Sequence, residues 1–254
     1  MEDSKVISKI EFDVNLTCKN CANAVKNVLS KFPEVKLVEC DIEKQSVVIE
    51  TSLPSLSIKE AIESTGKRAV LKGFGSSSLG SAVAELKNKP IFGVIRFHQT
   101  LEDLCVIDGT IDGLPPGEHG LHVHEYGDLS DLPMSIGPHF NPTESSHGGQ
   151  NDASRHYGDL GNIFADSKGR ASFRIEDHQL KVHEIIGRSI AVSSDKDDFG
   201  LGNSESSKMD GNSGTSLAAA IIARSAGLFE NPKRLCQCDG INIWDERSQP
   251  MSSL

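Results

Sequence analysis

Apolar and polar residues alternate in short runs along the first third of the chain, as they do in strands and helices that each bury one face. Alternation with a period of two predicts strands, and apolar residues at helical spacing predict helices. The strands are predicted at residues 6–15, 35–42, 46–50 and 68–72, and the helices at residues 20–30 and 57–64. This β-α-β-β-α-β order is that of the ferredoxin-like fold, so we predict such an α+β domain over residues 1–74.

The rest of the chain has a different pattern. Residues 75–84 are rich in Gly and Ser, a composition typical of a flexible linker. Residues 85–229 contain short alternating strands punctuated by Gly, Pro and Asp, which predicts an all-β sandwich or barrel. Within them, residues 125–156 form a polar loop whose length is typical of a functional or tethered segment. Residues 230–254 have too few apolar side chains for a core and are predicted to be a short extended tail.

Charge and composition exclude several classes of partner. The chain has 26 basic and 36 acidic residues, a net charge of −10, and the excess of acid lies after residue 75. An acidic surface attracts phosphates poorly, so we do not expect a nucleic acid partner. The longest apolar run, residues 217–223, is far shorter than the roughly 20 residues of a membrane span, so no stable membrane insertion is expected. The acidic first residues lack an apolar signal segment, which favours a cytoplasmic, reducing location.

Two of the six cysteines, Cys18 and Cys21, fall between the first predicted strand and helix. Their sulfurs can therefore converge on one ion near a helix N-terminus, where partial positive charge favours thiolates. Two thiolates suit Cu(I), whereas a structural zinc site takes four ligands. The alternatives are a thioredoxin-like redox pair, for which the order of elements is wrong, and two buried structural cysteines. Cys40 and Cys105 are predicted to be small packed residues.

A second pair of cysteines, Cys236 and Cys238, is separated by one residue in the predicted tail. In an extended chain such residues share a face, with Cα atoms roughly 6.5–7 Å apart, at the upper edge of what a disulfide can bridge. An internal disulfide here would be strained and easily reduced. The pair therefore suits thiol exchange with another protein or Cu(I) binding, and incidental surface cysteines are the alternative.

Histidines are concentrated around the long polar loop. His122 and His124 lie two apart on a predicted strand, so they point to the same face. The residues that follow complete a zinc-type set of imidazoles and one carboxylate: His139, His147, His156 and Asp159. A metal bound there would explain how so long a loop stays ordered. Each histidine alone would be an ordinary surface residue, and it is the combined spacing that indicates a metal site.

Two stretches resemble known metal-binding families. Residues 16–21 and the following helix resemble the metal-binding loop of small copper metallochaperone domains, with Leu16 in place of the usual Met. Residues 85–228 resemble the Cu,Zn superoxide dismutases, which implies an eight-stranded Greek-key barrel. That resemblance implies three copper-type positions, four zinc ligands and one carboxylate that links the two sites. These are His122, His124 and His139 for copper, His139, His147, His156 and Asp159 for zinc, and Asp197 as the link.

The chain also departs from the dismutases. Ser193 stands where they have the fourth copper histidine, and Ser216 where they have the arginine that attracts superoxide. Without a complete copper site we expect no dismutase activity. The family's disulfide cannot form, because the loop has no cysteine and the strand position is Ala219. Since a missing bridge typically costs about 2–4 kcal/mol, we expect bound zinc to contribute heavily to the stability of the barrel.

The three parts together resemble the family of copper chaperones for superoxide dismutase. That resemblance implies capture of Cu(I) at Cys18 and Cys21, and docking on immature Cu,Zn superoxide dismutase as a heterodimer through the zinc-bound barrel, with residues 217–227 as the candidate surface. It also implies copper delivery and promotion of the client's disulfide through Cys236 and Cys238. A homodimer of the free chain is compatible with this scheme. The alternatives are an active dismutase with an added metal-binding domain, and a copper-buffering or thiol-sensing protein without a client.

Overall fold

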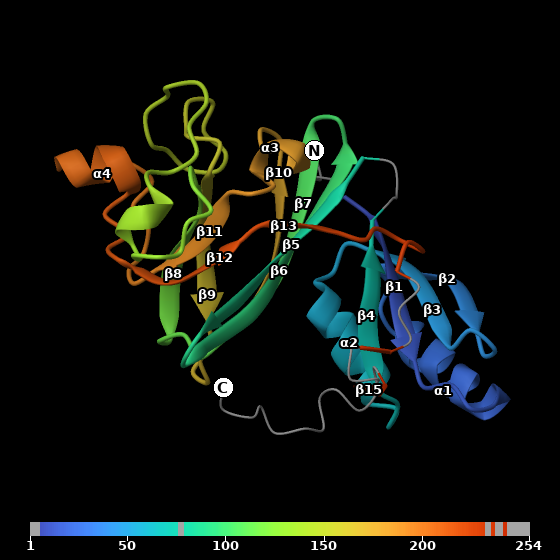
Figure 1. The fold of residues 1–254 in the computed structure, drawn as a ribbon. Coiled ribbons are helices and arrows are strands. Elements are labelled where there is room, and N and C mark those ends of the chain that lie inside the picture. Colours follow the sequence, from blue (N-terminus) through green and yellow to red (C-terminus); the bar gives the residue numbers. More distant parts are fainter. Residues whose placement is uncertain (1–5, 76–78, 232–234, 237–240, 243–254) are drawn as a thin grey trace. The chain divides into compact units, whose positions relative to one another are not determined.

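The computed structural model describes residues 6–75, 79–231, 235–236 and 241–242 (Figure 1). The chain forms two compact units: residues 1–77 together with 226–254, and residues 78–225. The first unit contains a four-stranded sheet and the second a nine-stranded sheet. A small separate ladder joins β14 (Leu235–Cys236) to β15 (Ile241–Asn242).

The first unit has the predicted ferredoxin-like fold. Its elements are β1 (Ser8–Val14), α1 (Lys19–Leu29), β2 (Val35–Asp41), β3 (Ser46–Thr51), α2 (Ser55–Glu63) and β4 (Ala69–Phe74). The strands pair in the order β2-β3-β1-β4, all antiparallel. Alternate residues of β1, Ile10 and Phe12, are fully buried, as are Val25 of α1 and Ile58 of α2. The period of two in the strands and the helical spacing in α1 and α2 thus meet in one core.

The second unit is a nearly closed, all-antiparallel barrel, as the resemblance to the dismutases implied, with nine strands instead of eight because one residue separates the last two strands. Its strands are β5 (Ser81–Asn88), β6 (Ile91–Leu101), β7 (Leu104–Asp112), β8 (Gly117–His124), β9 (Asp159–Ala165), β10 (Arg170–Asp177), β11 (Ser189–Ser193), β12 (Ser216–Ile221) and β13 (Ala223–Ser225). They pair in the order β12-β11-β8-β9-β10-β7-β6-β5-β13. Strand β13 follows β12 after one residue. Because β12 pairs with β11 and β13 pairs with β5, the end of the barrel sequence brings the two sides of the sheet together and nearly closes it.

Two boundaries lie elsewhere than the composition suggests. Strand β5 begins at Ser81, so the last four residues of the expected linker, 75–84, belong to the barrel. Residues 226–229, expected at the end of the barrel, cluster with the first unit instead. At the first boundary, strand pairing includes residues 81–84 although their composition is that of a linker. At the second, residues 226–229 pack on the first unit although they follow the last strand of the barrel.

The two isolated cysteines differ in their packing. Cys105, on β7, is fully buried in the barrel core, which confirms the prediction for this residue. Burial, reinforced by the negative charge of Asp177, raises the pKa of its thiol far above the usual range. Cys40 is only half-buried, so the prediction of a packed residue holds there only in part. The reason is that β2 is an edge strand with an irregular register at Val38, whose side chain is 47% exposed.

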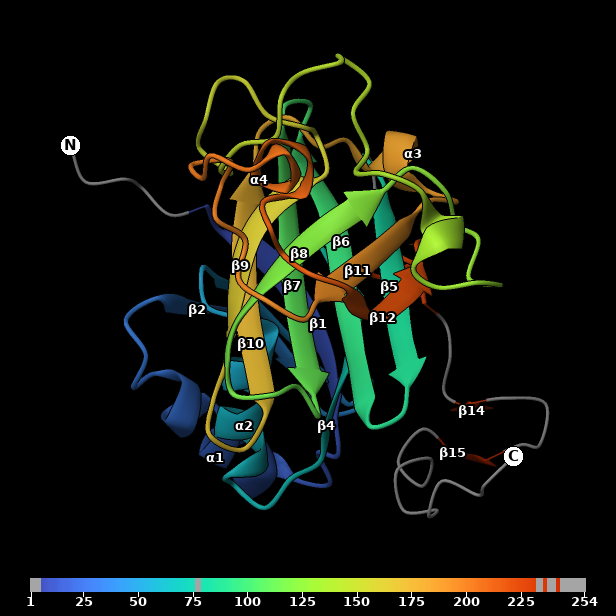
Figure 2. The same cartoon turned by 90° about the vertical axis from the view of Figure 1, so that its left-hand side faces the viewer.

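Two long connections lie at the same end of the barrel (Figures 1 and 2). One spans residues 125–158 between β8 and β9 and includes the short 3-10 helix η1 (Met134–Ile136). The other spans residues 194–215 between β11 and β12 and includes α4 (Glu205–Asp210). A short helix, α3 (Val182–Ile185), precedes β11. Among the described residues, none of the helices is long and apolar enough to span a membrane.

Candidate metal centres

The two amino-terminal sulfurs lie close together. Cys18 occupies the N-cap position of α1 with an extended backbone, and Cys21 lies in the first turn of that helix. Their Sγ atoms are 3.3 Å apart, and the Oγ1 atom of Thr17 lies 3.3 Å from Cys21 Sγ. Cys18 is exposed whereas Cys21 is 7% exposed. The pair therefore presents two convergent sulfurs, one of them open to solvent.

The surroundings of Cys21 favour its thiolate. The Thr17 hydroxyl and backbone donate to the sulfur, and with contributions from Cys18 and Lys67 they lower the pKa of Cys21 to about 6 against the effect of desolvation. A thiol with this pKa is mostly ionised near pH 7 without a metal. Thiolate is the form that binds a soft cation such as Cu(I). Thr17 adjoins the cysteine pair in the sequence, and a hydroxyl at that position was a usable signal.

The second cysteine pair lies at the limit of what the structure describes. Cys236 ends strand β14, whose backbone pairs with Ile241 of β15. Cys238 lies outside the described residues. The assignment of this pair to thiol exchange or copper delivery therefore stays a prediction.

Asp159 is the centre of a buried cluster in the barrel. Its Oδ1 lies 2.8 Å from His139 Nδ1 and 3.2 Å from His156 Nδ1, and its Oδ2 lies 3.0 Å from His147 Nδ1. All four residues are buried, and one ligand atom from each lies within 4.8 Å of the others. The structure thus brings together all four predicted zinc ligands, from β9 and the loop before it.

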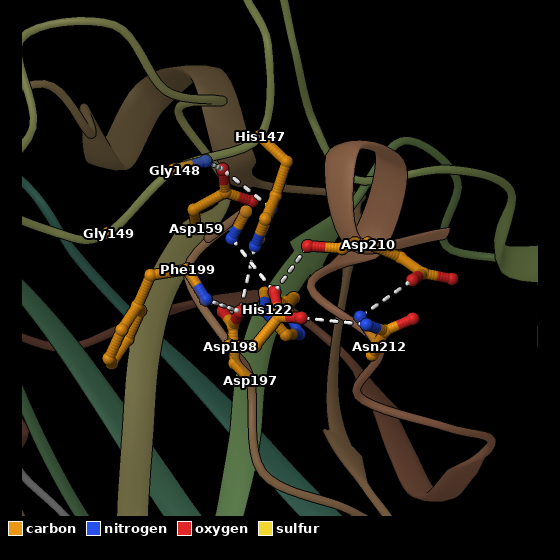
Figure 3. Close-up of polar contacts among 12 residues, drawn as sticks. His122, His147, Gly148, Gly149, Asp159, Asp197, Asp198, Phe199, Asp210 and Asn212 are labelled. Atoms are coloured by element: carbon orange, nitrogen blue, oxygen red, sulfur yellow. Dashed lines mark hydrogen bonds and ion pairs between the residues drawn. The ribbon is translucent and has the colours of Figure 1, made fainter. Parts of the chain in front are cut away.

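Asp197 links this cluster, through His147, to His122 (Figure 3). Its Oδ1 lies 2.8 Å from His147 Nε2 and its Oδ2 lies 3.0 Å from His122 Nε2. The carboxylate is fully buried. His122 and His139 stack with ring centroids 3.9 Å apart, so the copper-type and zinc-type positions share one continuous network. Asp197 therefore occupies the linking position that the dismutase resemblance implies.

The donor set fits a zinc ion. Both ring nitrogens of His147 lie near carboxylates: Nδ1 is 3.0 Å from Asp159 Oδ2, and Nε2 is 2.8 Å from Asp197 Oδ1. Although burial opposes the charge, hydrogen bonds to Asp159 and Asp197 raise the pKa of His147 to about 9. Burial alone would raise the pKa of Asp159, but its contacts with His139, His147 and His156 outweigh this effect and hold the pKa far below its usual range. Three imidazoles and one carboxylate are a usual zinc set, and a zinc ion would take the place of protons held between them.

The copper-type positions are only partly retained. His122 and His124 lie on β8 next to His139, but Ser193 stands at the fourth position and is buried on β11. The carbonyl oxygen of Ser193 accepts a hydrogen bond from the ring of His119, at 2.9 Å. A hydroxyl binds copper poorly compared with imidazole, so this half of the site lacks a strong ligand.

An apolar cluster occupies the region where the dismutase resemblance implies a disulfide. Ile136 of η1 is fully buried against Ala191 of β11 and Ala219 of β12, and Leu132 packs on the same cluster. The loop is thereby fixed to the barrel wall by packing. Nearby backbone contacts continue it: Tyr126 N donates to Ile136 O at 2.9 Å, and His124 Nδ1 lies 2.8 Å from Gly137 O.

Two groups that position the ligands were missed by the sequence analysis. The Asn162 side chain pairs with both backbone groups of Asp197: its Nδ2 donates to the carbonyl at 2.9 Å, and its Oδ1 accepts from the amide at 2.8 Å. Buried Arg155 pairs with Asp177 and donates to the backbone carbonyl of Asp159 at 2.9 Å. The pairs Asn162–Asp197 and Arg155–Asp177 are 35 and 22 positions apart, and the nearer contact of Arg155 with Asp159 uses a backbone carbonyl, so no local pattern of residue types reveals them.

Together these features define a two-part metal-binding protein, with a thiol-bearing ferredoxin-like unit and a barrel of the superoxide dismutase type. Family models agree: residues 11–68 match the heavy-metal-associated domain, and residues 91–222 match copper/zinc superoxide dismutase. The chain belongs to the family of copper chaperones for superoxide dismutase.

That membership rests on similarity over the whole chain. Proteins named copper chaperone for superoxide dismutase from Rattus norvegicus and Homo sapiens are each 52% identical to it, covering 98% and 96% of this chain and 93% and 90% of theirs. Among solved structures, the clock protein EA4 matches with 39% identity and a TM-score of 0.56, over 59% of this chain and 97% of its own.

Proposed function

We propose that this protein delivers Cu(I) to immature Cu,Zn superoxide dismutase. The observation that carries the proposal is the contrast between its two metal centres. The sulfurs of Cys18 and Cys21 lie 3.3 Å apart with Cys18 exposed, whereas the barrel keeps a complete zinc set but has Ser193 in its copper half. A barrel of this kind serves as a docking module, and the copper it helps to transfer comes from the other unit.

We assign the steps to parts of the chain as follows. Residues 1–74 capture Cu(I) as the cargo, with the Cys21 thiolate ready near pH 7. The barrel, residues 81–225, holds zinc through His139, His147, His156 and Asp159 and docks the client, which is consistent with the exposure of Ile221 (46%) at the end of β12. The tail, residues 230–254, exchanges thiols with the client. The Cys18 and Cys21 thiols must stay reduced to bind Cu(I), which suits the cytoplasm.

Thiol exchange through the tail has a defined balance. An external two-electron oxidant such as O₂ first takes two electrons and two protons from the Cys236 and Cys238 thiols, so that a disulfide forms and O₂ leaves as H₂O₂. A client thiolate then attacks one tail sulfur and displaces the other as a thiolate, which gives a mixed disulfide. The second client thiolate attacks the client sulfur of that bond, so the client leaves oxidised and the tail leaves reduced. The strain expected for a bridge between residues i and i+2 favours this direction.

The proposal is tested by activation of zinc-loaded, disulfide-reduced superoxide dismutase with the copper-loaded chain. We expect the wild type to activate the client, and both Cys18→Ser/Cys21→Ser and Cys236→Ser/Cys238→Ser to lose most of that activity. Cys40→Ser is the matched control and should activate as the wild type does. If either double variant activates like the wild type, the role assigned to that pair is wrong.

A functioning dismutase is the second candidate, favoured only by the retained His122, His124 and His139. It predicts superoxide consumption by the copper-loaded chain above the rate of an equal amount of free copper. We expect none, because the Ser193 hydroxyl is a weak copper ligand.

A further inference from the structure

A short segment after the barrel packs on the sheet of the first unit. Residues 226–230 lie against β1 and β4, at Glu11 and Gly73. The backbone amide of Phe229 donates to Glu11 Oε2 at 3.0 Å, although the two residues are 218 positions apart. Gly227 and Glu230 close a local turn, in which Gly227 N donates to Glu230 Oε2 at 2.8 Å. We call residues 226–230 the tail root.

The carboxylate that receives the tail root is built into the sheet. Glu11 is 3% exposed, and its other oxygen lies 3.4 Å from Lys72 Nζ on β4. Each carboxylate oxygen therefore has one partner, a lysine of the sheet or an amide of the tail root. A hydrogen bond to a buried carboxylate is stronger than one between neutral groups. The contact of Phe229 with Glu11 is therefore stronger than a hydrogen bond between exposed neutral groups.

Glycine at position 73 makes the close approach possible. A Cβ atom at this position would lie 3.0 Å from Gly227 O and 3.0 Å from Leu228 Cα, and 3.1 Å from Glu11 Oε2. These are backbone atoms of the tail root and the carboxylate itself, so a Cβ alone requires them to shift by a few tenths of an ångström, and a larger side chain would displace the segment. Leu228 is 7% exposed in this arrangement. The sheet surface at Gly73 thus leaves room for the backbone of the tail root to pack directly against it.

We propose that this face of the sheet, around Glu11 and Gly73, is the docking surface of the tail root, and that it confines the tail thiols to the neighbourhood of Cys18 and Cys21. From Phe229 the extended chain reaches at most about 25 Å to Cys236. By the same measure Cys18 lies within about 25 Å of Glu11. Anchoring at this point gives the two thiol pairs an effective concentration in the millimolar range. The docking stands on geometry alone, and its use in copper handling rests on the proposed function.

Hydrogen exchange of the full-length chain, followed by mass spectrometry, tests the docking. Gly73→Val and Glu11→Ala should each speed exchange in residues 226–230 by about tenfold or more, because the valine displaces the tail root and the alanine removes the acceptor of the Phe229 amide. Glu50→Gln is the control, since this carboxylate lies on the same sheet and pairs with Lys9 and Lys36. Exchange in β1 and β3 within the same samples reports whether a variant still folds. Unchanged exchange of the tail root in a folded Gly73→Val chain would overturn the docking.

Chemical cross-linking tests the confinement. A short bismaleimide applied to the dilute, metal-free chain should join Cys18 or Cys21 to Cys236 or Cys238 within one molecule, as mapped on peptides. We expect several-fold less of these cross-links in Gly73→Val than in Glu50→Gln. Equal yields in the two variants would refute the confinement. Neither measurement uses copper or a client, so either result is independent of the activation assay.

Discussion

The apolar cluster around Ile136 makes a quantitative prediction about how the long loop is held. Ile136→Ala removes three buried carbon atoms from a side chain that is fully buried against Ala191 and Ala219. At about 0.8 kcal/mol for each carbon the lost transfer free energy is roughly 2.4 kcal/mol, and the residual cavity adds to it. We therefore expect the free energy of unfolding to fall by about 2–4 kcal/mol, inside the range for such truncations.

Scanning calorimetry of the full chain measures this change. For a unit of about 150 residues, 1 kcal/mol corresponds to about 2–4 °C, so the barrel transition should move down by about 5–15 °C. The barrel transition is identified as the one that chelation of zinc displaces. Met134→Ala is the matched control, because Met134 lies in the same 3-10 helix but is 79% exposed. Its transition should stay within about 1–2 °C of the wild type.

The same substitution should also weaken zinc binding. The backbone around Ile136 accepts from Tyr126, and Gly137 O contacts His124, immediately before the ligand His139. Loosening this segment raises the entropy that zinc must remove when it gathers its ligands. We expect a lower zinc affinity for Ile136→Ala than for Met134→Ala in competition with a chromophoric chelator. If the two variants matched in both melting and zinc affinity, packing at Ile136 would not hold the loop.

Three further predictions follow from single residues. Asp197→Asn should lower zinc affinity by about 10- to 100-fold in chelator competition, because it removes the carboxylate that orients His147, and wild-type affinity would contradict that role. Burial and the charge of Arg174 lower the pKa of His98 to about 4, so the stability this group contributes is present above pH 6.5 and lost as pH falls from 6.5 toward 4. The stability difference between wild type and His98→Gln should therefore change by up to about 3 kcal/mol over that interval in denaturant titrations, and a constant difference would refute it. Iodoacetamide at pH 7 should label Cys18 and Cys21 well before Cys105, and equal labelling on peptide maps would show that the pKa of Cys105 is not raised.

The sequence predicted those parts of the molecule that repeat with a local period. All six elements of the first unit follow from apolar spacing, because each element buries one face of one core. The four zinc-type residues were found because a metal imposes its own spacing on a loop. The fold is what brings these residues together, and the resemblance to the dismutases predicted that they would meet. They are His139, His147, His156 and Asp159.

What the sequence did not predict depends on backbone atoms and on distant partners. The Asn162 side chain bonds the backbone amide and carbonyl of Asp197. Because every residue other than proline has both groups, the residue type at position 197 does not indicate an asparagine at position 162. The tail root likewise docks by the amide of Phe229 and by the absence of a side chain at Gly73. Edge strand β2 shows a third cause, since the irregular register at Val38 leaves Cys40 half-buried where alternation predicted packing.

The two metal centres differ in the way that their proposed roles require. An ion that must be handed on needs a site into which another thiolate can enter, and Cys18 is exposed beside a Cys21 whose thiolate forms near pH 7. An ion that must stay needs every ligand buried and oriented from behind, as Asp197 does for His147. With Ser193 in place of a copper ligand and Ile136 in the region where the dismutase resemblance implies a disulfide, the barrel has the fold of a dismutase but lacks a strong fourth copper ligand and a thiol in this loop. If it binds zinc as proposed, such a barrel can stay folded without a disulfide, and the Cys18 and Cys21 thiols lie in the other unit.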